Sequence, residues 1–271
     1  MPELPEVETV ARQLNAALAG RSIRRIDILD PKLNGFDRAA AEGRSIAAVL
    51  RRGKHVAFEL LAPGKPPLWL AVHLRMTGRL VFRDRWPEGA DAPARAPRAR
   101  FELDAGEMRF FDTRRFGSLR LEASLEDIPA PGLDPMGSAF TARALAILLR
   151  GARQPIKTWL LRQDRLCGLG NIYASEILFW ARIDPRREAG TLTSEETRRL
   201  LFATRRTLRL AIRHCGVTFS DFQDSRGEIG AYQNFLRAYG RAGQPCRVCG
   251  GEIRRIVQQQ RSTFFCPACQ K

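Results

Sequence analysis

Four of the six cysteines stand between position 246 and the end of the chain at position 271, and their spacing constrains the fold more than any other feature. They form two C-x2-C pairs separated by sixteen residues, namely Cys246, Cys249, Cys266 and Cys269. Each pair can hold two thiolates on one side of a tight turn, so two pairs complete a tetrahedral four-sulfur site for zinc. Disulfides or unpaired thiols are the weaker alternative. Because four thiolates leave no coordination position for water, we expect one structural zinc ion.

The residues between the two cysteine pairs predict two strands joined by a short turn, with Arg261 close to that turn. A basic hairpin braced by zinc can follow a phosphate backbone. The overall charge favours such a polyanionic partner, because 45 lysines and arginines face 29 acidic residues and give a net charge of +16. A GC-rich genome would raise the arginine count, but it would not explain the excess over acids.

Length and hydrophobic content bound the architecture. The chain has 271 residues, of which 44% are hydrophobic, and this suffices for two domains with their own cores. No apolar run is long enough for a membrane helix, and no signal peptide is visible, so we expect no membrane association.

The pattern of apolar and polar residues changes along the chain. Residues 5–19 carry a helical apolar stripe, and 22–125 hold short alternating runs typical of a β-sandwich or barrel, including a hairpin around Ala105–Gly106. A segment rich in proline and glycine looks like a linker, and helical periods follow it. We therefore expect an α+β protein with four parts: an N-terminal helix and β-sandwich (1–125), a linker (126–138), a helical domain (139–236) and the zinc finger (237–271).

The helical region contains four expected helices. Thr141 is an expected N-cap for the first, Pro155 begins the second, and Asn171 begins the third. The fourth begins with Thr193 and Glu196, which predict a capping box. The stretch from Gly168 through Gly170 to Asn171 either binds phosphate at a helix N-terminus or merely connects two helices, and the residues alone favour neither. The polar stretch 217–233 is expected to be a mobile loop.

Two short motifs carry exposed-looking polar and aromatic residues. "HLRMTG" contains His73 and Met76, and "DTRRFG" contains Arg114 and Phe116. An arginine beside an aromatic can stack on bases or fill a gap in a base stack. The alternatives are a satisfied strand histidine, a core methionine and a surface arginine beside a buried phenylalanine. The motifs H-E-x-x-H, Walker A and G-x-S-x-G are absent.

The opening "MPELPEVETV" is acidic in a basic protein. A helix start explains Pro5 and Glu6, since proline suits the first turn and a carboxylate favours the positive end of the helix dipole. It does not explain Pro2 or Glu3.

The combination resembles the bacterial formamidopyrimidine-DNA glycosylase family. The six matching motifs are "MPELPEVETV", "RRGKHV", "HLRMTG", "DTRRFG", "GLGNIYASE" and the four-cysteine hairpin, and the match runs from Met1 to Lys271. The resemblance implies an N-terminal β-sandwich and a helical domain with a helix–two-turn–helix motif. It also implies a partner, double-stranded DNA that contains oxidised bases or abasic sites. We expect from it a monomer in the bacterial cytoplasm, associated with the nucleoid.

The resemblance implies that Met1 is removed and that the secondary amine of Pro2 is the nucleophile, with Glu3 as general acid and base. The implied reaction is removal of oxidised purines through a Schiff base, followed by β,δ-elimination of the strand. For Glu6 we favour a role in the helix start, and the alternative is that it assists catalysis.

The remaining motifs take their roles from the same resemblance. Lys54 is implied to contact the flank of the damaged nucleotide. Met76, Arg114 and Phe116 resemble the trio that fills the hole left by a base turned out of the duplex. The implied phosphate ligands are His73, Lys157, Asn171 and Arg261.

Two residues depart from the family pattern. Arg75 stands where glycine is expected, and Thr113 stands where proline is expected. Both neighbour wedge residues, so we expect them to affect how the wedge sits in the DNA and not the reaction itself. The alternatives are an endonuclease VIII-like glycosylase for oxidised pyrimidines and a non-catalytic zinc-ribbon protein that binds DNA.

Overall fold

The computed structural model divides the chain into two compact units. It describes residues 1–33, 35–87, 96–218, 225–228 and 230–271. The first unit comprises Met1–Pro129 and His214–Ala231, and the second comprises Ala130–Arg213 and Tyr232–Lys271. Among the described residues, no helix is both long and apolar enough to cross a membrane. Most of the expected loop at 217–233 lies in the first unit, but its positions 219–224 and 229 lie outside the described residues.

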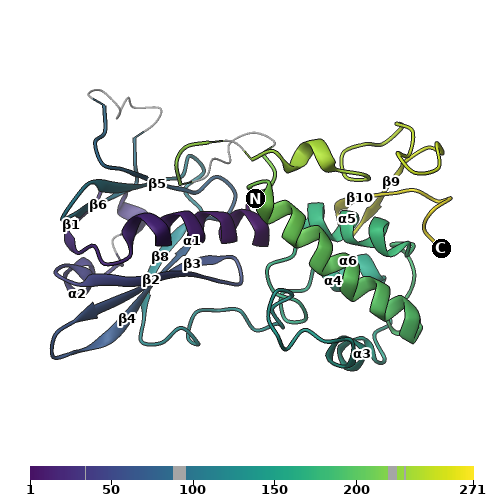
Figure 1. Cartoon of the computed structure of the whole chain (residues 1–271), viewed down its shortest axis with the longest axis horizontal. Coiled ribbons are helices and arrows are strands. Elements are labelled where there is room, and N and C mark those ends of the chain that lie inside the picture. The colour runs from purple at the N-terminus through teal and green to yellow at the C-terminus, as the bar shows by residue number, and fades with distance from the viewer. Residues whose placement is uncertain (34, 88–95, 219–224, 229) are drawn as a thin grey trace. The chain divides into compact units, whose positions relative to one another are not determined.

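The first unit contains two antiparallel four-stranded sheets (Figure 1). One has the order β2-β3-β4-β8 and the other β1-β6-β7-β5. The strands are β1 (Ile23–Ile28), β2 (Ser45–Arg52), β3 (His55–Ala62), β4 (Lys65–His73), β5 (Arg79–Arg83), β6 (Ala99–Leu103), β7 (Glu107–Phe111) and β8 (Ser118–Glu122). Two short helices, η1 (Pro31–Leu33) and α2 (Arg38–Ala41), lie between β1 and β2. The expected hairpin is confirmed, because β6 and β7 pair across a turn at Gly106.

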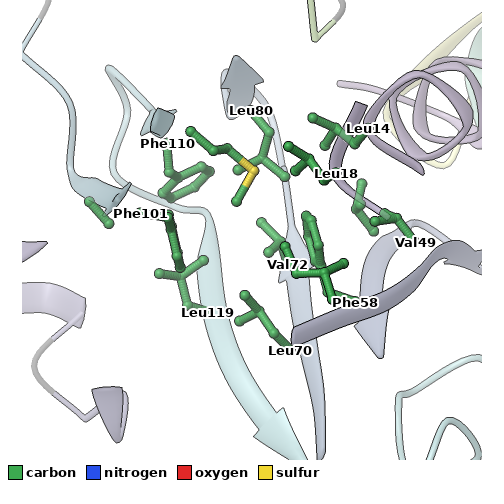
Figure 2. Packing of buried hydrophobic residues seen from close by; sticks show 14 of the residues in the cluster. Leu14, Leu18, Val49, Phe58, Leu70, Val72, Leu80, Phe101, Phe110 and Leu119 are labelled. Atoms are coloured by element: carbon green, nitrogen blue, oxygen red, sulfur yellow. The ribbon is translucent and has the colours of Figure 1, made fainter. Parts of the chain in front are cut away.

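Helix α1 (Leu4–Leu18) packs against strands of both sheets, β2 and β3 of one and β5 of the other. It begins one residue before the expected range and ends before Gly20, whose backbone has a positive φ. Figure 2 shows side chains from α1 and both sheets meeting in one core. The labelled members of this core are Leu14, Leu18, Val49, Phe58, Leu70, Val72, Leu80, Phe101, Phe110 and Leu119. The sandwich expected from the alternating runs is therefore confirmed.

The second unit is built from four helices: α3 (Ala142–Leu149), α4 (Ile156–Leu160), α5 (Asn171–Ala181) and α6 (Ser194–Arg213). The expected caps are present: Thr141 accepts the Ala144 N–H, and Thr193 and Glu196 exchange side-chain and backbone bonds. Most residues of α5 are buried, since it packs against α4, α6 and the zinc hairpin. The short helices η3 (Ala189–Thr191) and η4 (Tyr232–Phe235) complete the unit.

One side chain bridges several positions of the connection from α4 to α5. The Gln163 amide donates to the carbonyls of Leu161 and Leu169, at 2.9 Å each, and accepts the Gly168 N–H at 3.0 Å. Gly168 has a φ of +88°, which a residue with a Cβ rarely adopts. This arrangement agrees with the expected helix–two-turn–helix motif.

The zinc hairpin consists of β9 (Arg254–Gln258) and β10 (Arg261–Phe265). Gln258 pairs with Arg261, so the turn has two residues, Gln259 and Gln260. Both have a positive φ, at 47° and 59°, as a type I′ hairpin turn requires. The turn therefore presents Arg261 at the end of the ribbon, as the sequence predicted.

Candidate functional site

The acidic tip of α1 is buried and hydrogen-bonded. Glu3 is the N-cap, and it forms a reciprocal capping box with Glu6. One Glu6 carboxylate oxygen accepts the Glu3 N–H at 2.8 Å, and the other accepts the Val217 N–H at 2.8 Å. Glu3 and Glu6 expose only 3% and 1% of their surfaces. Glu6 therefore fixes the backbone next to Pro2 and joins it to the 214–231 segment of the same unit.

This geometry adds a role that the sequence did not predict for Glu3. The helix start explained Pro5 and Glu6, but the capping box shows that Glu3 also belongs to the helix end. Pro2 itself is buried, whereas Met1 is exposed. The tip is thus a rigid end of α1.

Lys54 lies in the two-residue turn between β2 and β3, where Arg52 pairs with His55. The buried Arg51 side chain donates to Glu8 of α1 at 2.8 Å and to the Gly53 carbonyl at 3.3 Å. This bridge ties the turn that carries Lys54 to the first turns of α1. Helix α1 therefore joins the tip to the turn that carries Lys54.

His73 ends β4 and pairs with His55 across the sheet, with ring centroids 4.6 Å apart. The pKa of His73 is lowered to about 3, chiefly by burial and also by the nearby charges of His55, Arg75 and Lys54. The His73 Nδ1 accepts the Arg75 N–H at 3.0 Å. The imidazole is therefore neutral at pH 7 and carries its proton on Nε2, which makes it a hydrogen-bond donor without a charge.

The three expected wedge residues are exposed and lie on two neighbouring loops. Met76 follows β4, and it exposes 41% of its surface; Phe116 precedes β8 and exposes 53%. The Arg114 guanidinium lies 4.9 Å from the centroid of the Phe116 ring. Exposure on this scale rules out the alternatives in which Met76 and Phe116 are core residues.

Asp112 joins the two wedge loops. It accepts hydrogen bonds from the Thr77 hydroxyl and from the Gly117 N–H, the latter at 2.6 Å. The same Thr77 oxygen accepts the Arg114 N–H at 3.1 Å. Buried Arg98 neutralises Asp112 at 3.1 Å. The wedge side chains are thus exposed, but the backbone that carries them is anchored.

Both wedge loops contain an arginine with left-handed backbone: Arg75 has a φ of +52° and Arg115 a φ of +56°. Such a conformation costs a non-glycine residue about 1–2 kcal/mol. Arg115 is compensated by an ion pair with Asp30, and that arginine lowers the pKa of Asp30 well below its usual range. At Arg75 the positive φ explains why glycine would be favoured.

The turn from Asp112 to Arg115 shows why proline is favoured at position 113, where this chain has threonine. The Arg115 N–H donates to the Asp112 carbonyl at 3.2 Å, which makes Thr113 the second residue of a β-turn. Proline is favoured at that position because its φ is already set.

In the second unit, three of the expected phosphate ligands lie together. The fully buried Lys157 ammonium donates to the Asn171 side-chain oxygen at 2.5 Å, to Thr263 at 2.9 Å and to the Ser262 carbonyl at 3.2 Å. The Asn171 amide also donates to Ser262, at 2.9 Å. Arg261, which is exposed, directly precedes Ser262 in the hairpin. Lys157 thus fastens α4 and α5 to the hairpin, and its predicted direct phosphate contact stays a prediction.

The four cysteines form the expected metal site. Their sulfur atoms all lie within 4.8 Å of one another, with Cys249 and Cys266 at 3.5 Å and Cys246 and Cys269 at 3.9 Å. Zinc–sulfur bonds of about 2.3 Å in a tetrahedron place sulfurs about 3.8 Å apart, so the set fits zinc. Gln270 accepts the Cys266 N–H and donates to the Ile183 carbonyl, each at 2.9 Å, which fixes the site beside α5.

Three features define the class of zinc-finger proteins to which this fold belongs. They are a β-sandwich with a buried helical tip, a helix–two-turn–helix unit and a four-cysteine hairpin. Three family models match the chain. They are the formamidopyrimidine-DNA glycosylase N-terminal domain (residues 1–119), the H2TH domain of the same name (132–223) and a zinc finger found in FPG and IleRS (243–271). The chain belongs to the formamidopyrimidine-DNA glycosylase family.

Known relatives and solved structures match this chain over nearly its full length. The formamidopyrimidine-DNA glycosylase of Symbiobacterium thermophilum is 43% identical and is aligned over 100% of this chain and 89% of its own. The enzyme of Moorella thermoacetica is 44% identical over 94% of each chain. The crystal structure of MutM from Thermus thermophilus has a TM-score of 0.85 at 39% identity and covers 99% of this chain and 98% of its own. The Lactococcus lactis protein in complex with DNA containing an abasic site has a TM-score of 0.87 at 30% identity, covering 99% of each chain.

Proposed function

We propose that this chain is a bifunctional DNA glycosylase and AP lyase that removes oxidised purines, 8-oxoguanine and formamidopyrimidines, in base excision repair. The observation that carries the proposal is the buried tip of α1, where Glu3 and Glu6 hold the backbone beside Pro2. Family membership over the whole chain supports it. A non-catalytic zinc-ribbon protein would have no use for such a tip.

The proposed nucleophile is the secondary amine of Pro2 after removal of Met1. An α-amino group has a reference pKa of about 7.7–8.0, so a useful fraction is unprotonated at neutral pH. The amine forms a bond to C1′ of the damaged nucleotide while the bond from C1′ to the base breaks. The base leaves with the electron pair of that bond and takes up the proton that the amine nitrogen loses. Glu3 gives a proton to the sugar ring oxygen, and the ring opens.

The product of this step is an iminium that joins Pro2 to C1′. It withdraws electrons and acidifies the C2′ proton, and Glu3 accepts that proton. Loss of the 3′ phosphate is the β-elimination, and loss of the 5′ phosphate is the δ-elimination. Hydrolysis of the imine then frees the amine.

The other residues bind and deform the DNA. Met76, Arg114 and Phe116 fill the space left by the extruded nucleotide, and their anchored loops reduce the cost of holding that shape. Lys54 contacts the flank of the damaged nucleotide. His73, Asn171 and Arg261 bind phosphates, with His73 as a neutral donor, and Lys157 orients Asn171. The zinc ion on Cys246, Cys249, Cys266 and Cys269 keeps the hairpin folded.

Domain boundaries and location follow from the same proposal. Residues 1–125 supply the nucleophile and wedge, 126–138 the linker, 139–236 the helical DNA-binding domain and 237–271 the zinc finger. A monomer that repairs chromosomal DNA works in the bacterial cytoplasm beside the nucleoid.

The test is borohydride trapping on a duplex with 8-oxoguanine opposite cytosine. We expect a protein–DNA adduct that peptide mass spectrometry maps to Pro2. An uncleaved residue before Pro2 converts the amine into an amide, so this variant must trap nothing while still binding zinc and DNA. An adduct that maps to Lys54, or normal cleavage by the extended variant, contradicts the proposal.

Oxidised pyrimidines are a second candidate substrate class. The Lactococcus lactis relative has been crystallised with DNA containing an oxidised pyrimidine, at 31% identity and a TM-score of 0.86. Side-by-side cleavage of duplexes with 8-oxoguanine and with an oxidised pyrimidine separates the two classes. Faster cleavage of the pyrimidine duplex would assign this chain to the alternative.

A further inference from the structure

Helix α6 carries a hollow that none of the proposed DNA-binding residues uses. It has a volume of about 450 Å³ and is lined by Leu201, Phe202, Arg205, Arg206, Arg209, Leu210 and Arg213. Phe202 exposes 69% of its surface, the largest exposed fraction among the large hydrophobic side chains of the described residues. Leu201 and Leu210 are half-buried and add an aliphatic floor. A hollow with an exposed aromatic on a helix face is a feature of binding surfaces.

The same face is strongly basic. Between Thr197 and Arg213 the sequence of α6 contains six arginines and no acidic residue. Arg199 is neutralised by Glu195 in the first turns of the helix. Among the described residues, none of the four arginines that line the hollow forms an ion pair.

Two of these arginines are already oriented by neighbouring groups. Arg205 donates to the Phe140 carbonyl at 2.8 Å, and the Arg206 guanidinium lies 3.7 Å from the centroid of the Trp180 ring. Such contacts reduce the conformational entropy that a partner would have to remove. Arg209 and Arg213 are exposed and follow one another at a spacing of four along the helix. Two of the four positive charges that line the hollow are therefore held in place before a partner binds.

We propose that this hollow, named the α6 groove for its seven lining residues, docks an acidic peptide segment of a partner protein that inserts one apolar side chain. Carboxylates would pair with the arginine rim, where bidentate contacts are available. The apolar side chain would cover Phe202 between the two leucines. A buried aromatic surrounded by charged contacts is the usual anatomy of a small protein–protein anchor.

The composition of the groove favours a peptide over a nucleic acid. Surfaces that bind single strands stack successive bases on several exposed aromatics. Here the lining contains one aromatic, and its remaining apolar surface is aliphatic. The Trp180 ring is already covered by Arg206. An aliphatic floor fits a side chain better than it fits a base.

The experiment uses the full-length protein with zinc bound and a fluorescein-labelled peptide of aspartate and glutamate with one central phenylalanine. Fluorescence anisotropy gives its affinity for the wild-type protein, F202A and R209E. R198E is the matched control, because Arg198 is exposed on the same helix but does not line the groove. A second peptide with serine in place of phenylalanine separates the apolar contact from the charge.

We expect F202A and R209E each to weaken binding of the phenylalanine peptide by about tenfold, and R198E to change it by about twofold or less. F202A must leave binding of the serine peptide unchanged. All three variants must trap and cleave lesion DNA as the wild type does. Equal losses for R198E and R209E would reduce the binding to general charge attraction and overturn the proposal.

Two further outcomes would assign the groove to another occupant. A single-stranded oligonucleotide that displaces the peptide, and loses affinity in F202A, would make the groove a nucleic-acid site. A dimer in sedimentation velocity that disappears in F202A would make a second copy of this chain the occupant. Either result overturns the peptide proposal.

Discussion

Replacing Gly216 with alanine tests how the α1 tip is held. Gly216 has a φ of +76°, and a Cβ at this position would lie 2.4 Å from a carboxylate oxygen of Glu6. Real Cβ atoms do not approach so closely, so the Glu6 side chain must move. That carboxylate accepts the N–H groups of Glu3 and Val217, and both bonds are buried. The substitution therefore detaches the tip from the 214–231 segment without touching Pro2 or Glu3.

The expected cost has two parts. An alanine with positive φ costs about 1 kcal/mol. Hydrogen bonds to a charged group contribute about 1.5–3 kcal/mol each, and at least one of the two is lost or lengthened when Glu6 moves. We therefore expect Gly216→Ala to lower the free energy of unfolding by about 3 kcal/mol.

Gly20→Ala is the matched control. Gly20 has a φ of +88° and nothing within 4 Å of the position of an added Cβ, so it reports the backbone cost alone. Urea unfolding gives the difference between the two variants, and borohydride trapping gives the effect on the amine. We expect Gly216→Ala alone to slow trapping. Equal destabilisation by both variants, with normal trapping in each, would refute the reasoning that Glu6 positions the tip.

Four more outcomes follow from the site. His73→Gln is expected to weaken DNA binding without changing its salt dependence, whereas Arg261→Gln flattens that dependence, because only the charged residue releases counterions. The pKa values of His73 and His55, about 3 and about 4, lie below the value of an unfolded histidine, so stability is expected to fall with pH below about 6.5. The loss should be about 1.4 kcal/mol per pH unit for each histidine and is measurable by urea unfolding between pH 7 and pH 5. Arg75→Gly is expected to stabilise the fold by about 1 kcal/mol in thermal melts but to reduce the salt dependence of DNA binding. Cys249→Ser is expected to lose zinc in metal analysis and to weaken DNA binding while the first unit stays folded.

The fold was largely predictable because its signals are local. Cysteine spacing, the capping box at Thr193 and the turn residues at Ala105–Gly106 each act within a few positions, and the structure contains all three. The start of α1 moved by one residue because Glu3 caps the helix. A sequence does not reveal which of several carboxylates near a helix end is the cap.

The positioning residues of the site were less predictable. Asp112 and Thr77 anchor the wedge loops, although they are 35 positions apart in the chain. The aspartate stood in the quoted "DTRRFG" motif, but nothing in the sequence identified its partner. Lys157 was expected at a phosphate, yet its ammonium is surrounded by acceptors from α5 and β10. Contacts between segments far apart in sequence depend on the tertiary fold, so local patterns do not reveal them.

In both units a buried carboxylate holds irregular backbone in place by accepting its N–H groups. In the first unit, Glu6 accepts N–H groups from two segments. In the second, fully buried Glu176 of α5 accepts the N–H groups of Arg237, Ala238 and Tyr239 at 2.8–2.9 Å. Burial raises the pKa of Glu176, and the three donors oppose that rise.

Such a carboxylate is costly to bury, and its cost is offset only while every donor stays in place. Each one therefore links the conformations of the segments that supply those donors. At Glu176 the linked segment leads from η4 toward the zinc hairpin, whereas at Glu6 it includes the proposed nucleophile. Removing either carboxylate would release backbone on both sides of it. Glu6→Gln should therefore loosen the tip more than the loss of one hydrogen bond predicts. The reason is that the amide places a donor where one of the two N–H groups needs an acceptor.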